Sequence, residues 1–381
     1  MSKKSKIEQT LPIASVLPDA AISRRNFLSL MMAGAGSAAL AACGGGSETS
    51  AVEAAAKTTD LAATQKAATA TQSLFYGMNG HMAWGTGIYK TMTPAQQLAI
   101  LKDLGVTNYR CDVADAGMST YLATALKGPF AGSGVAILPV INPRSARWDP
   151  NSTEAAAYTL GYDLAVRITK PLVGLVKYIE CGNELDTIGL KIGGDGSQTT
   201  DWNPAQWPSF RGVIRGMIDG VKAVDPTINC GVNVGIPMAY RALQMLWTGV
   251  TPDGTAQGVG GAALVRWDFT TYHWYKSSGK IECAGRNNMC VNILQVLKDS
   301  FNVPIWLTEF GWSGSNDTAQ SASDYMTYAL TSYKSIKDKY NIQSVMMYCV
   351  IDANYGLIQP DGATKNLSYT TFKNFVAANP V

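Results

Sequence analysis

Residues 136–181 read AILPVINPRSARWDPNSTEAAAYTLGYDLAVRITKPLVGLVKYIEC and contain one strand–helix–strand unit. Two short apolar runs, Ala136–Ile141 and Val176–Cys181, flank a helical pattern over Thr153–Val173. Thr153 is of a residue type that is favoured at the start of a helix. Apolar runs that alternate with longer amphipathic segments are typical of repeated βα units and a parallel sheet. The stretch therefore predicts an α/β fold.

The same alternation continues on both sides of this unit. No Gly-x-Gly-x-x-Gly turn follows the first apolar run, which disfavours a doubly wound sheet that binds a dinucleotide. Eight strands with crossover helices predict a (β/α)8 TIM barrel. The expected strands are Leu74–Met78, Asn108–Val113, Ala136–Ile141, Val176–Cys181, Asn229–Val234, Trp267–Tyr272, Ile305–Thr308 and Ser344–Val350. Other expected helices are Pro94–Leu104, Trp207–Val224, Asn292–Ser300 and Ala319–Lys337.

The first 42 residues carry the features of an export signal. Ser23-Arg24-Arg25-Asn26-Phe27-Leu28 precedes a weakly apolar run that ends at Ala42 and is shorter than the roughly 20 residues that span a bilayer. The paired arginines resemble a twin-arginine signal, and Leu40-Ala41-Ala42-Cys43 resembles a lipobox. We expect residues 1–42 to be a cleaved signal peptide and Cys43 to carry a lipid anchor.

The residue after Cys43 bears on the destination of the protein. Gly44 rather than Asp follows the Cys. In this respect the sequence resembles lipoproteins that are sorted to the outer membrane. The predicted location is thus the cell envelope, at the outer membrane or its periplasmic face. An ordinary secretory signal that contains a Cys is the alternative.

Composition divides the rest of the chain into a tether and one domain. Residues 43–72 are mainly Ala, Thr, Ser and Gly and cannot bury a core, so we expect a flexible tether. Residues 73–381 suit one catalytic barrel. The net charge of +3 resides in the signal peptide, so the mature chain is formally neutral. A neutral chain lacks the positive charge that binding to nucleic acid requires.

The seven cysteines suggest one lipid site, one candidate disulfide and several core positions. Cys283 and Cys290 share a polar loop and could pair in an oxidising compartment. Their spacing does not resemble a zinc site, and only two histidines are present, so no metal is expected. The remaining cysteines lie in or beside expected strands and are interpreted as buried apolar residues: Cys111, Cys181, Cys230 and Cys349.

Polar and acidic residues gather where the expected strands end, which is where barrel enzymes carry their chemistry. Two carboxylates decide the interpretation. Glu184 follows the fourth strand in Gly182-Asn183-Glu184, and Glu309 follows the seventh in Thr308-Glu309-Phe310-Gly311. Strands four and seven oppose each other, so the two carboxylates should face one another across the barrel mouth. A buried carboxylate is costly unless it is paired or used.

A carboxylate pair at this place fits a retaining glycosidase. One carboxylate attacks the anomeric carbon, and the other protonates the leaving oxygen and later activates water, at a separation of roughly 5–5.5 Å. The nucleophile must stay ionised, which Arg110 and the Tyr275 hydroxyl could ensure. The acid must stay protonated, aided by burial and by its negative neighbour.

The motifs Gly182-Asn183-Glu184, His273-Trp274-Tyr275 and Thr308-Glu309-Phe310-Gly311 together resemble the clan A glycoside hydrolases. That clan of retaining (β/α)8 enzymes includes families 5, 39, 53 and 128. The resemblance implies that Glu184 is the acid/base and Glu309 the nucleophile. It also implies that Asn183 binds the sugar 2-hydroxyl, that Tyr275 and Arg110 support Glu309, and that His273 lies near the sugar.

Several further residues are candidates for contact with the substrate. Trp84 and Trp312 could stack on the apolar face of a sugar ring, although packing at the barrel rim is an equal alternative. Many relatives in the clan carry a Trp on strand eight. Tyr348 stands at that place here, so it is the candidate platform, and His81 at the end of the first strand could contact the sugar.

The predicted activity is a retaining glycoside hydrolase that cleaves O-glycosidic bonds of an extracytoplasmic polysaccharide, with endo action on a β-glycan favoured. No cofactor is expected, and we expect a monomer whose membrane contact is the lipid on Cys43. A non-catalytic glycan-binding lipoprotein and a transglycosylase on the same barrel are alternatives. The sequence does not indicate the sugar or the linkage.

Overall fold

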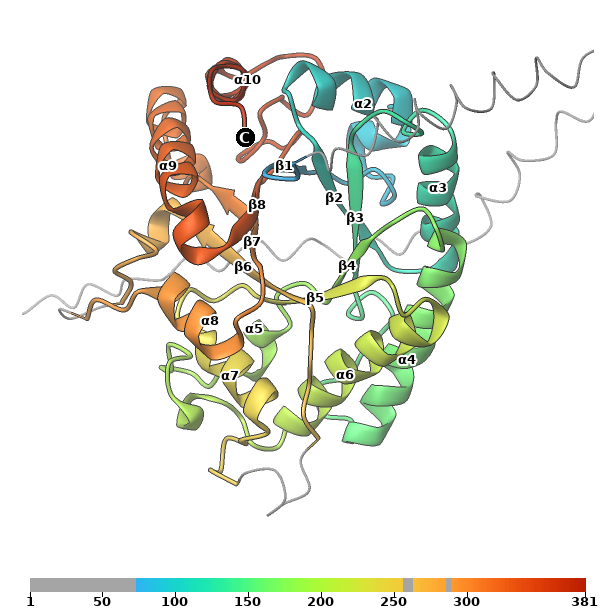
Figure 1. Ribbon diagram of the computed structural model, residues 1–381, viewed down its shortest axis with the longest axis vertical. Helices are drawn as coiled ribbons and strands as arrows, with labels where there is room; N and C mark the ends of the chain where they lie inside the picture. The colour runs from blue at the N-terminus through green and yellow to red at the C-terminus, as the bar shows by residue number, and fades with distance from the viewer. Residues whose placement is uncertain (1–72, 256–262, 286–288) are drawn as a thin grey trace, which may run out of the picture. The chain divides into compact units, whose positions relative to one another are not determined.

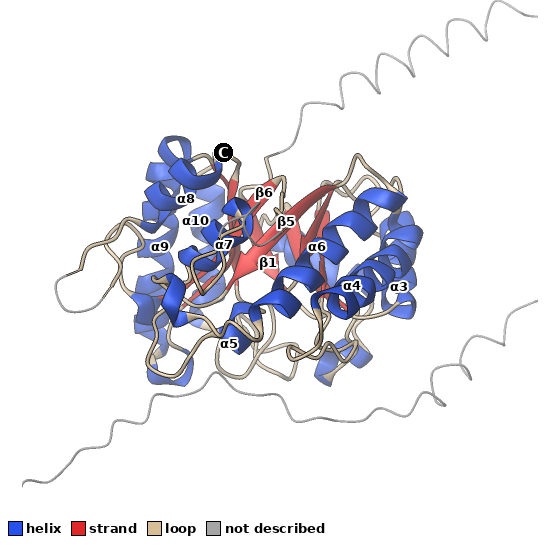
Figure 2. Ribbon diagram, turned by 90° about the horizontal axis from the view of Figure 1, so that it is seen from below, coloured by secondary structure: helices blue, strands red, loops and turns tan. Residues whose placement is uncertain are grey.

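The computed structural model describes residues 73–255, 263–285 and 289–381. The expected signal peptide, the tether and Cys43 lie outside these ranges. Eight parallel strands form a closed barrel in sequence order, in which β8 pairs with β1. Helices surround the strands (Figures 1 and 2), which confirms the predicted TIM barrel. Within the described residues, no helix is both long and apolar enough to cross a membrane.

The barrel strands agree closely with the expected ones, and three of them have the expected limits. β6 and β7 run three residues further than expected and carry His273, Tyr275 and Glu309 within the sheet, whereas β8 begins two residues earlier and ends three residues earlier than expected, so Tyr348 follows the strand. The strands are β1 Tyr76–Asn79, β2 Asn108–Val113, β3 Ala136–Ile141, β4 Tyr178–Cys181, β5 Asn229–Val234, β6 Phe269–Tyr275, β7 Ile305–Gly311 and β8 Ile342–Met347.

Five of the nine described α-helices, namely α2, α3, α4, α8 and α9, begin at a residue whose side chain caps them. Thr93 accepts a hydrogen bond from the Gln96 backbone, and Thr153 and Asn292 cap α4 and α8 in the same way. The α-helices are α2 Pro94–Asp103, α3 Ala116–Lys127, α4 Glu154–Thr169, α5 Asp186–Gly189, α6 Trp207–Val224, α7 Tyr240–Thr248, α8 Ile293–Phe301, α9 Ala319–Tyr340 and α10 Leu367–Ala378. Short 3-10 turns are η2 Gly87–Lys90, η3 Lys170–Leu172, η4 Thr199–Asp201, η5 Lys276–Ser278 and η6 Gly314–Asn316.

The core has two parts. A large cluster lies between the strands and the helices, and a smaller one of Leu138, Phe269, Trp306 and Met346 comes from alternate barrel positions. A β-carbon on Gly231 would lie 2.5 Å from the Phe269 ring, so a residue without a side chain is needed there. The small cluster fills one end of the barrel interior, and polar side chains occupy the rest.

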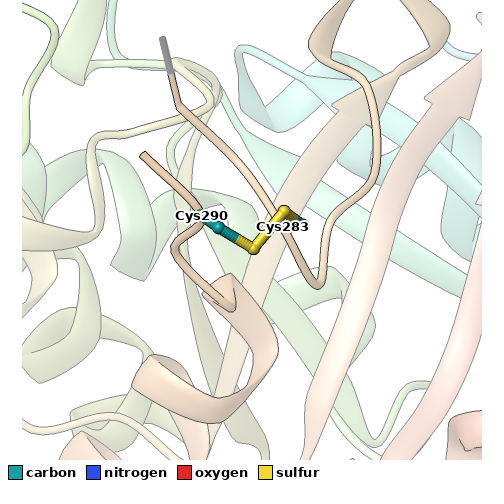
Figure 3. Close-up of a disulfide and its surroundings, with 2 residues drawn as sticks. All are labelled: Cys283 and Cys290. Carbon is teal, nitrogen blue, oxygen red and sulfur yellow. A yellow bond between two sulfur atoms is a disulfide. The ribbon is translucent and has the colours of Figure 1, made fainter. Parts of the chain in front are cut away.

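The cysteines behave as the sequence indicates. Cys283 and Cys290 form a disulfide within the loop that joins η5 to α8 (Figure 3). The four cysteines in or beside the strands are free and buried, so they serve as apolar core residues.

Candidate active site

Glu309 enters the barrel at an irregularity in β7. Tyr272 on β6 pairs with Leu307, but His273, the next residue, pairs with Glu309, so Thr308 is an extra residue in β7. A bulge of this kind breaks the alternation of side chains and re-aims those that follow it. Thr308 and Glu309 are accordingly both buried, and Glu309 lies beside His273.

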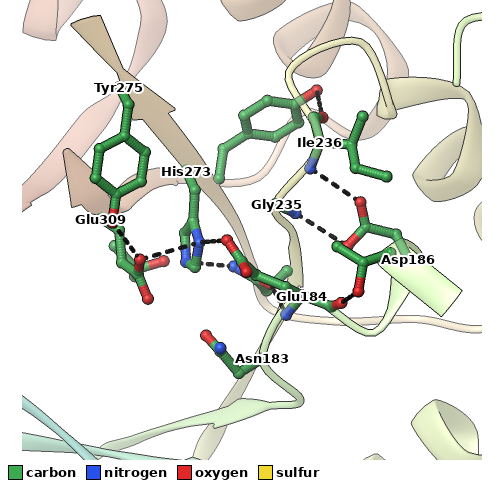
Figure 4. A network of polar contacts seen from close by, with 12 residues as sticks. Asn183, Glu184, Asp186, Gly235, Ile236, His273, Tyr275 and Glu309 are labelled. Atoms are coloured by element: carbon green, nitrogen blue, oxygen red, sulfur yellow. Dashed lines mark hydrogen bonds and ion pairs between the residues drawn. The ribbon is translucent and has the colours of Figure 1, made fainter. Parts of the chain in front are cut away.

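Two donors hold the Glu309 carboxylate. Arg110 Nη1 lies 2.7 Å from Oε1. The Tyr275 hydroxyl donates to Oε2 at 2.7 Å (Figure 4). Hydrogen bonds from a guanidinium and a phenol stabilise the ionised form of a carboxylate. Arg110 and Tyr275 are thus placed on Glu309, as the sequence motifs imply.

Arg110 connects Glu309 on β7 with Asn183 in the loop after β4. Its side chain is 3% exposed, and its nitrogens donate to four acceptors on three strands and the loop after β4. These are Glu309 Oε1 at 2.7 Å, Glu180 Oε2 at 2.5 Å, Asn79 Oδ1 at 2.8 Å and Asn183 Oδ1 at 2.7 Å. One guanidinium therefore fixes the nucleophile candidate and Asn183 at the same time.

Glu180 is a buried third carboxylate that the motifs do not indicate. It is 0% exposed, and its Oε1 accepts a hydrogen bond from the Thr308 hydroxyl at 2.9 Å while Oε2 pairs with Arg110. The signal for it in the sequence is an acidic residue between Ile179 and Cys181 in an apolar strand, where alternation points it into the barrel. It binds Arg110 at Nε, whereas Glu309 binds at Nη1.

Glu184 has a left-handed backbone conformation, with φ of 50°. This conformation is unfavourable for a residue with a side chain and needs support from its surroundings. Asn233 Oδ1 accepts the Glu184 backbone N–H at 2.6 Å. On the other side, the Glu184 carbonyl accepts hydrogen bonds from Arg144 and from the Thr187 hydroxyl. The chain thus clamps the peptide groups on both sides of this residue.

Asp186 fixes the loop that packs against Glu184. Its carboxylate is 0% exposed and accepts the backbone N–H groups of Gly235 and Ile236, both at 3.0 Å (Figure 4). Burial raises the pKa of Asp186 to about 6, although these two hydrogen bonds oppose the effect. Asp186 therefore ties the loop after β4 to the loop after β5.

Gly235 leaves room for the Glu184 side chain, which gives a testable prediction. A β-carbon at Gly235 would lie 2.4 Å from Glu184 Cγ and Oε1. Gly235→Ala should therefore displace the Glu184 carboxylate and lower kcat about 100-fold, the cost of a displacement of about 1 Å at a reacting group. Steady-state kinetics on a glycan that the protein cleaves measure the loss, with Gly117→Ala in α3, where no positive φ is required, as the control. Unchanged kinetics in Gly235→Ala would show that the position of Glu184 is unimportant.

The two carboxylates and His273 lie close together. His273 Nδ1 is 2.8 Å from Glu184 Oε1 and 3.4 Å from Glu309 Oε2. One oxygen from each carboxylate and one nitrogen of the ring all lie within 4.8 Å of one another. Such a set of atoms could also bind a metal ion, but Arg110, Tyr275 and Asn233 already bind its members.

The pKa directions of the two carboxylates are the reverse of the sequence expectation. Burial raises the pKa of Glu309 above its usual value, although His273, Arg110 and Tyr275 act against it. Burial also acts to raise the pKa of Glu184, but the hydrogen bond from His273 and the nearby guanidinium groups of Arg144 and Arg110 act against it, and the pKa is lowered. The physical reason is the place of His273, which lies closer to Glu184 than to Glu309.

His81, Asp112 and Tyr348 form a polar group at the ends of β1, β2 and β8. His81 Nδ1 lies 3.5 Å from Asp112 Oδ2, and His81 Nε2 lies 3.5 Å from the Tyr348 hydroxyl. The side chains of His81 and Asp112 are 27% and 22% exposed, so both can reach a ligand. Asp112 is a residue of this group that the motifs do not indicate.

The two candidate tryptophans differ in environment. Trp312 is 4% exposed, and its indole N–H donates to the Asn354 carbonyl at 2.8 Å. Its ring is therefore used for packing and offers little surface to a sugar. Trp84 is partly exposed at the barrel mouth, so its role as a stacking surface stays a prediction.

Comparison by sequence gives one family. Residues 259–367 match the model described as the glycosyl hydrolase catalytic core. The matched segment carries β6, β7 and β8 and therefore includes His273, Tyr275 and Glu309. No curated protein matches the chain.

Comparison by structure gives glycosidase barrels. The virulence factor SghA from Agrobacterium tumefaciens has a TM-score of 0.58 at 12% identity, with 81% of this chain and 98% of that chain covered. A beta-glucosidase from Thermotoga maritima in complex with deoxynojirimycin has a TM-score of 0.57 at 11% identity, with 81% and 98% covered. A family 39 glycoside hydrolase from Bacteroides cellulosilyticus WH2 has a TM-score of 0.55 at 17% identity, with 80% and 63% covered.

At these identities the likeness to solved structures concerns the fold alone. The activity rests on the match to the catalytic core, whose segment contains Glu309 and the residues beside it. A closed eight-stranded barrel of parallel strands carries that core. The chain is therefore a glycoside hydrolase on a (β/α)8 barrel.

Proposed function

We propose that the protein is a retaining glycoside hydrolase with Glu309 as nucleophile and Glu184 as acid/base. The observation that carries this proposal is the approach of the two carboxylates, whose nearest oxygens lie within 4.8 Å. Retaining enzymes have carboxyl groups about 5–5.5 Å apart, whereas inverting enzymes need about 6.5–9.5 Å to admit a water molecule. The spacing in this site favours retention.

The two residues have different access to solvent, which suits their roles. The Glu309 side chain is 8% exposed and held by Arg110 and Tyr275, so it is aimed and shielded from water. The Glu184 side chain is 28% exposed. Glu309 would attack the anomeric carbon as the bond to the leaving oxygen breaks, and Glu184 would protonate that oxygen. Water would then attack the anomeric carbon of the glycosyl ester and give a proton to Glu184, and the bond from that carbon to Glu309 would break, releasing Glu309 as a carboxylate.

Substrate binding would assign the proton to Glu184. In the free site the His273 N–H stabilises the ionised form of Glu184. A glycosidic oxygen that approaches Glu184 competes with the His273 N–H for contact with the Glu184 carboxyl group. Arg110 and Tyr275 keep their hydrogen bonds to Glu309. The bound sugar therefore favours a protonated Glu184 and an ionised Glu309, which is the arrangement that the first step needs.

The proposed substrate is a polysaccharide outside the cytoplasm, cleaved within the chain. The support for this location is the twin-arginine and lipobox pattern of residues 23–43, which predicts export and an anchor on Cys43. The described residues form one barrel without a second domain over the site, which favours endo action. Asn183, whose Oδ1 accepts a hydrogen bond from Arg110, would bind the sugar 2-hydroxyl.

The first experiment combines substrate and stereochemistry. Protein comprising residues 44–381 is incubated with a panel of plant and bacterial β-glycans, and products are identified by mass spectrometry. Proton NMR spectra recorded in the first minutes of the reaction then determine the anomeric configuration of the new reducing ends. We expect oligosaccharides whose new reducing ends first appear in the β configuration. Initial α products would contradict the retaining mechanism, and glycan binding without any products would favour a non-catalytic lipoprotein.

A further inference from the structure

Asn233 at the end of β5 contacts both the acid/base candidate and the histidine beside it. Its side chain is 3% exposed. Asn233 Oδ1 lies 2.6 Å from the Glu184 backbone nitrogen, and Asn233 Nδ2 lies 2.7 Å from His273 Nε2. A single buried amide thus bridges Glu184 and His273, both of which are labelled in Figure 4.

The contact with Glu184 fixes which way the amide faces. A backbone N–H can only donate, so its partner must be the carbonyl oxygen of Asn233. The amide NH2 group therefore faces His273, and an NH2 group can only donate. His273 Nε2 must then accept a hydrogen bond, which requires a free lone pair on that nitrogen. Turning the amide over would place two donors against each other at Glu184.

The opposite side of the ring is consistent with a proton on Nδ1. This nitrogen lies 2.8 Å from Glu184 Oε1 and 3.4 Å from Glu309 Oε2, and carboxylate oxygens accept hydrogen bonds. A ring protonated on both nitrogens would press its Nε2–H against the Asn233 NH2 group. His273 is 1% exposed, so water could not relieve such a contact.

Other charges act on the ring as well. Burial lowers the pKa of His273, while the charges of Glu309 and Glu184 raise it and prevail over burial. The Asn233 NH2 group opposes these carboxylates, because it disfavours the second ring proton. The other charged groups that interact with the ring are Arg110, Asp112 and Asp186.

We propose that Asn233 is a positioning residue that fixes His273 as the neutral Nδ1–H tautomer. His273 is then only a donor toward the two carboxylates, and it does not take up the proton that Glu184 delivers. This consequence for catalysis rests on the proposed function. The tautomer itself does not, because it follows from the contacts of the free protein.

The test is the tautomeric state of His273 by nitrogen NMR. The chain has two histidines, so protein labelled with 15N-histidine gives two sets of ring signals, and His81→Gln assigns them. In the wild type at neutral pH we expect Nδ1 of His273 to be protonated and Nε2 to be unprotonated. In Asn233→Asp the new carboxylate accepts from both neighbours, so His273 should become doubly protonated and titrate at least about one pH unit higher.

The control is Asn229→Asp at the start of the same strand, where the side chain contacts the Lys177 carbonyl. It should leave the His273 signals unchanged. On the glycan substrate, Asn233→Asp should lower kcat at least about tenfold and shift the pH profile, and Asn229→Asp should do neither.

A proton on His273 Nε2 in the wild type would overturn the proposal, as would unchanged His273 signals in Asn233→Asp. If Asn233→Asp does not fold, the wild-type spectrum still decides. A protein without glycosidase activity but with the expected spectrum would refute the proposed function and leave the tautomer assignment intact.

Discussion

Glu309→Gln should lower turnover of every substrate by on the order of 10⁴-fold or more while the protein stays folded. An amide cannot form the covalent bond to the anomeric carbon, so neither step of double displacement can proceed. The fold should survive because Arg110 keeps its contacts with Glu180, Asn79 and Asn183. Initial rates on the released-oligosaccharide assay measure the loss, and circular dichroism with thermal unfolding checks the fold.

The matched control is Glu282→Gln. Glu282 lies in the η5–α8 loop and pairs with Lys339 and Tyr340 on the outside of the barrel. This variant should retain wild-type rates. Wild-type turnover in Glu309→Gln would rule out Glu309 as nucleophile and redirect attention to Glu184. A loss in both variants would point to a general effect on the fold.

Glu184→Ala should produce a loss that depends on the leaving group. Without the acid, departure of a sugar alkoxide should slow by about 10²–10⁴-fold, whereas an aryl group with a low pKa leaves with little help. The rates of a natural oligosaccharide and of a dinitrophenyl glycoside, compared in the variant and in the wild type, measure the difference. The Ala side chain also removes the acceptor of the His273 N–H.

Azide provides a second measurement on the same variant. For the aryl glycoside, the slow step should become hydrolysis of the ester on Glu309, because no base activates water. Azide needs no base, so it should attack the anomeric carbon, displace Glu309 and raise the rate, with a β-glycosyl azide as product. An equal loss for both leaving groups and no effect of azide would assign Glu184 a structural role.

Much of the fold follows from the sequence because each strand is a short apolar run between helices with recognisable starts. The site is predictable where a carboxylate follows such an apolar run, as at Glu184 and Glu309, because burial of a carboxylate is costly unless the group is paired or used. The resemblance to clan A then assigns roles to Arg110 and Tyr275, and the structure places both on Glu309.

The remaining parts of the site depend on features that side-chain alternation does not indicate. Alternation would place Thr308 and Glu309 on opposite faces of β7, but the bulge turns both inward. The roles of Glu180 and Asp186 depend on partners 128 and 49 residues away in sequence, respectively. The pKa directions likewise depend on the place of one His273 nitrogen between two carboxylates, which only the folded barrel defines.

The pairing of β8 with β1 makes completion of the barrel a late event in synthesis. Val345 pairs with Tyr76, so the two strands that close the sheet lie about 270 residues apart. A nascent chain that has not yet emerged beyond Met347 exposes the free edges of β1 and β7, and free edges favour association with other chains. The ribosome must therefore release the chain through Met347 before the sheet can lose its edges, and a truncation before β8 should yield an aggregating protein.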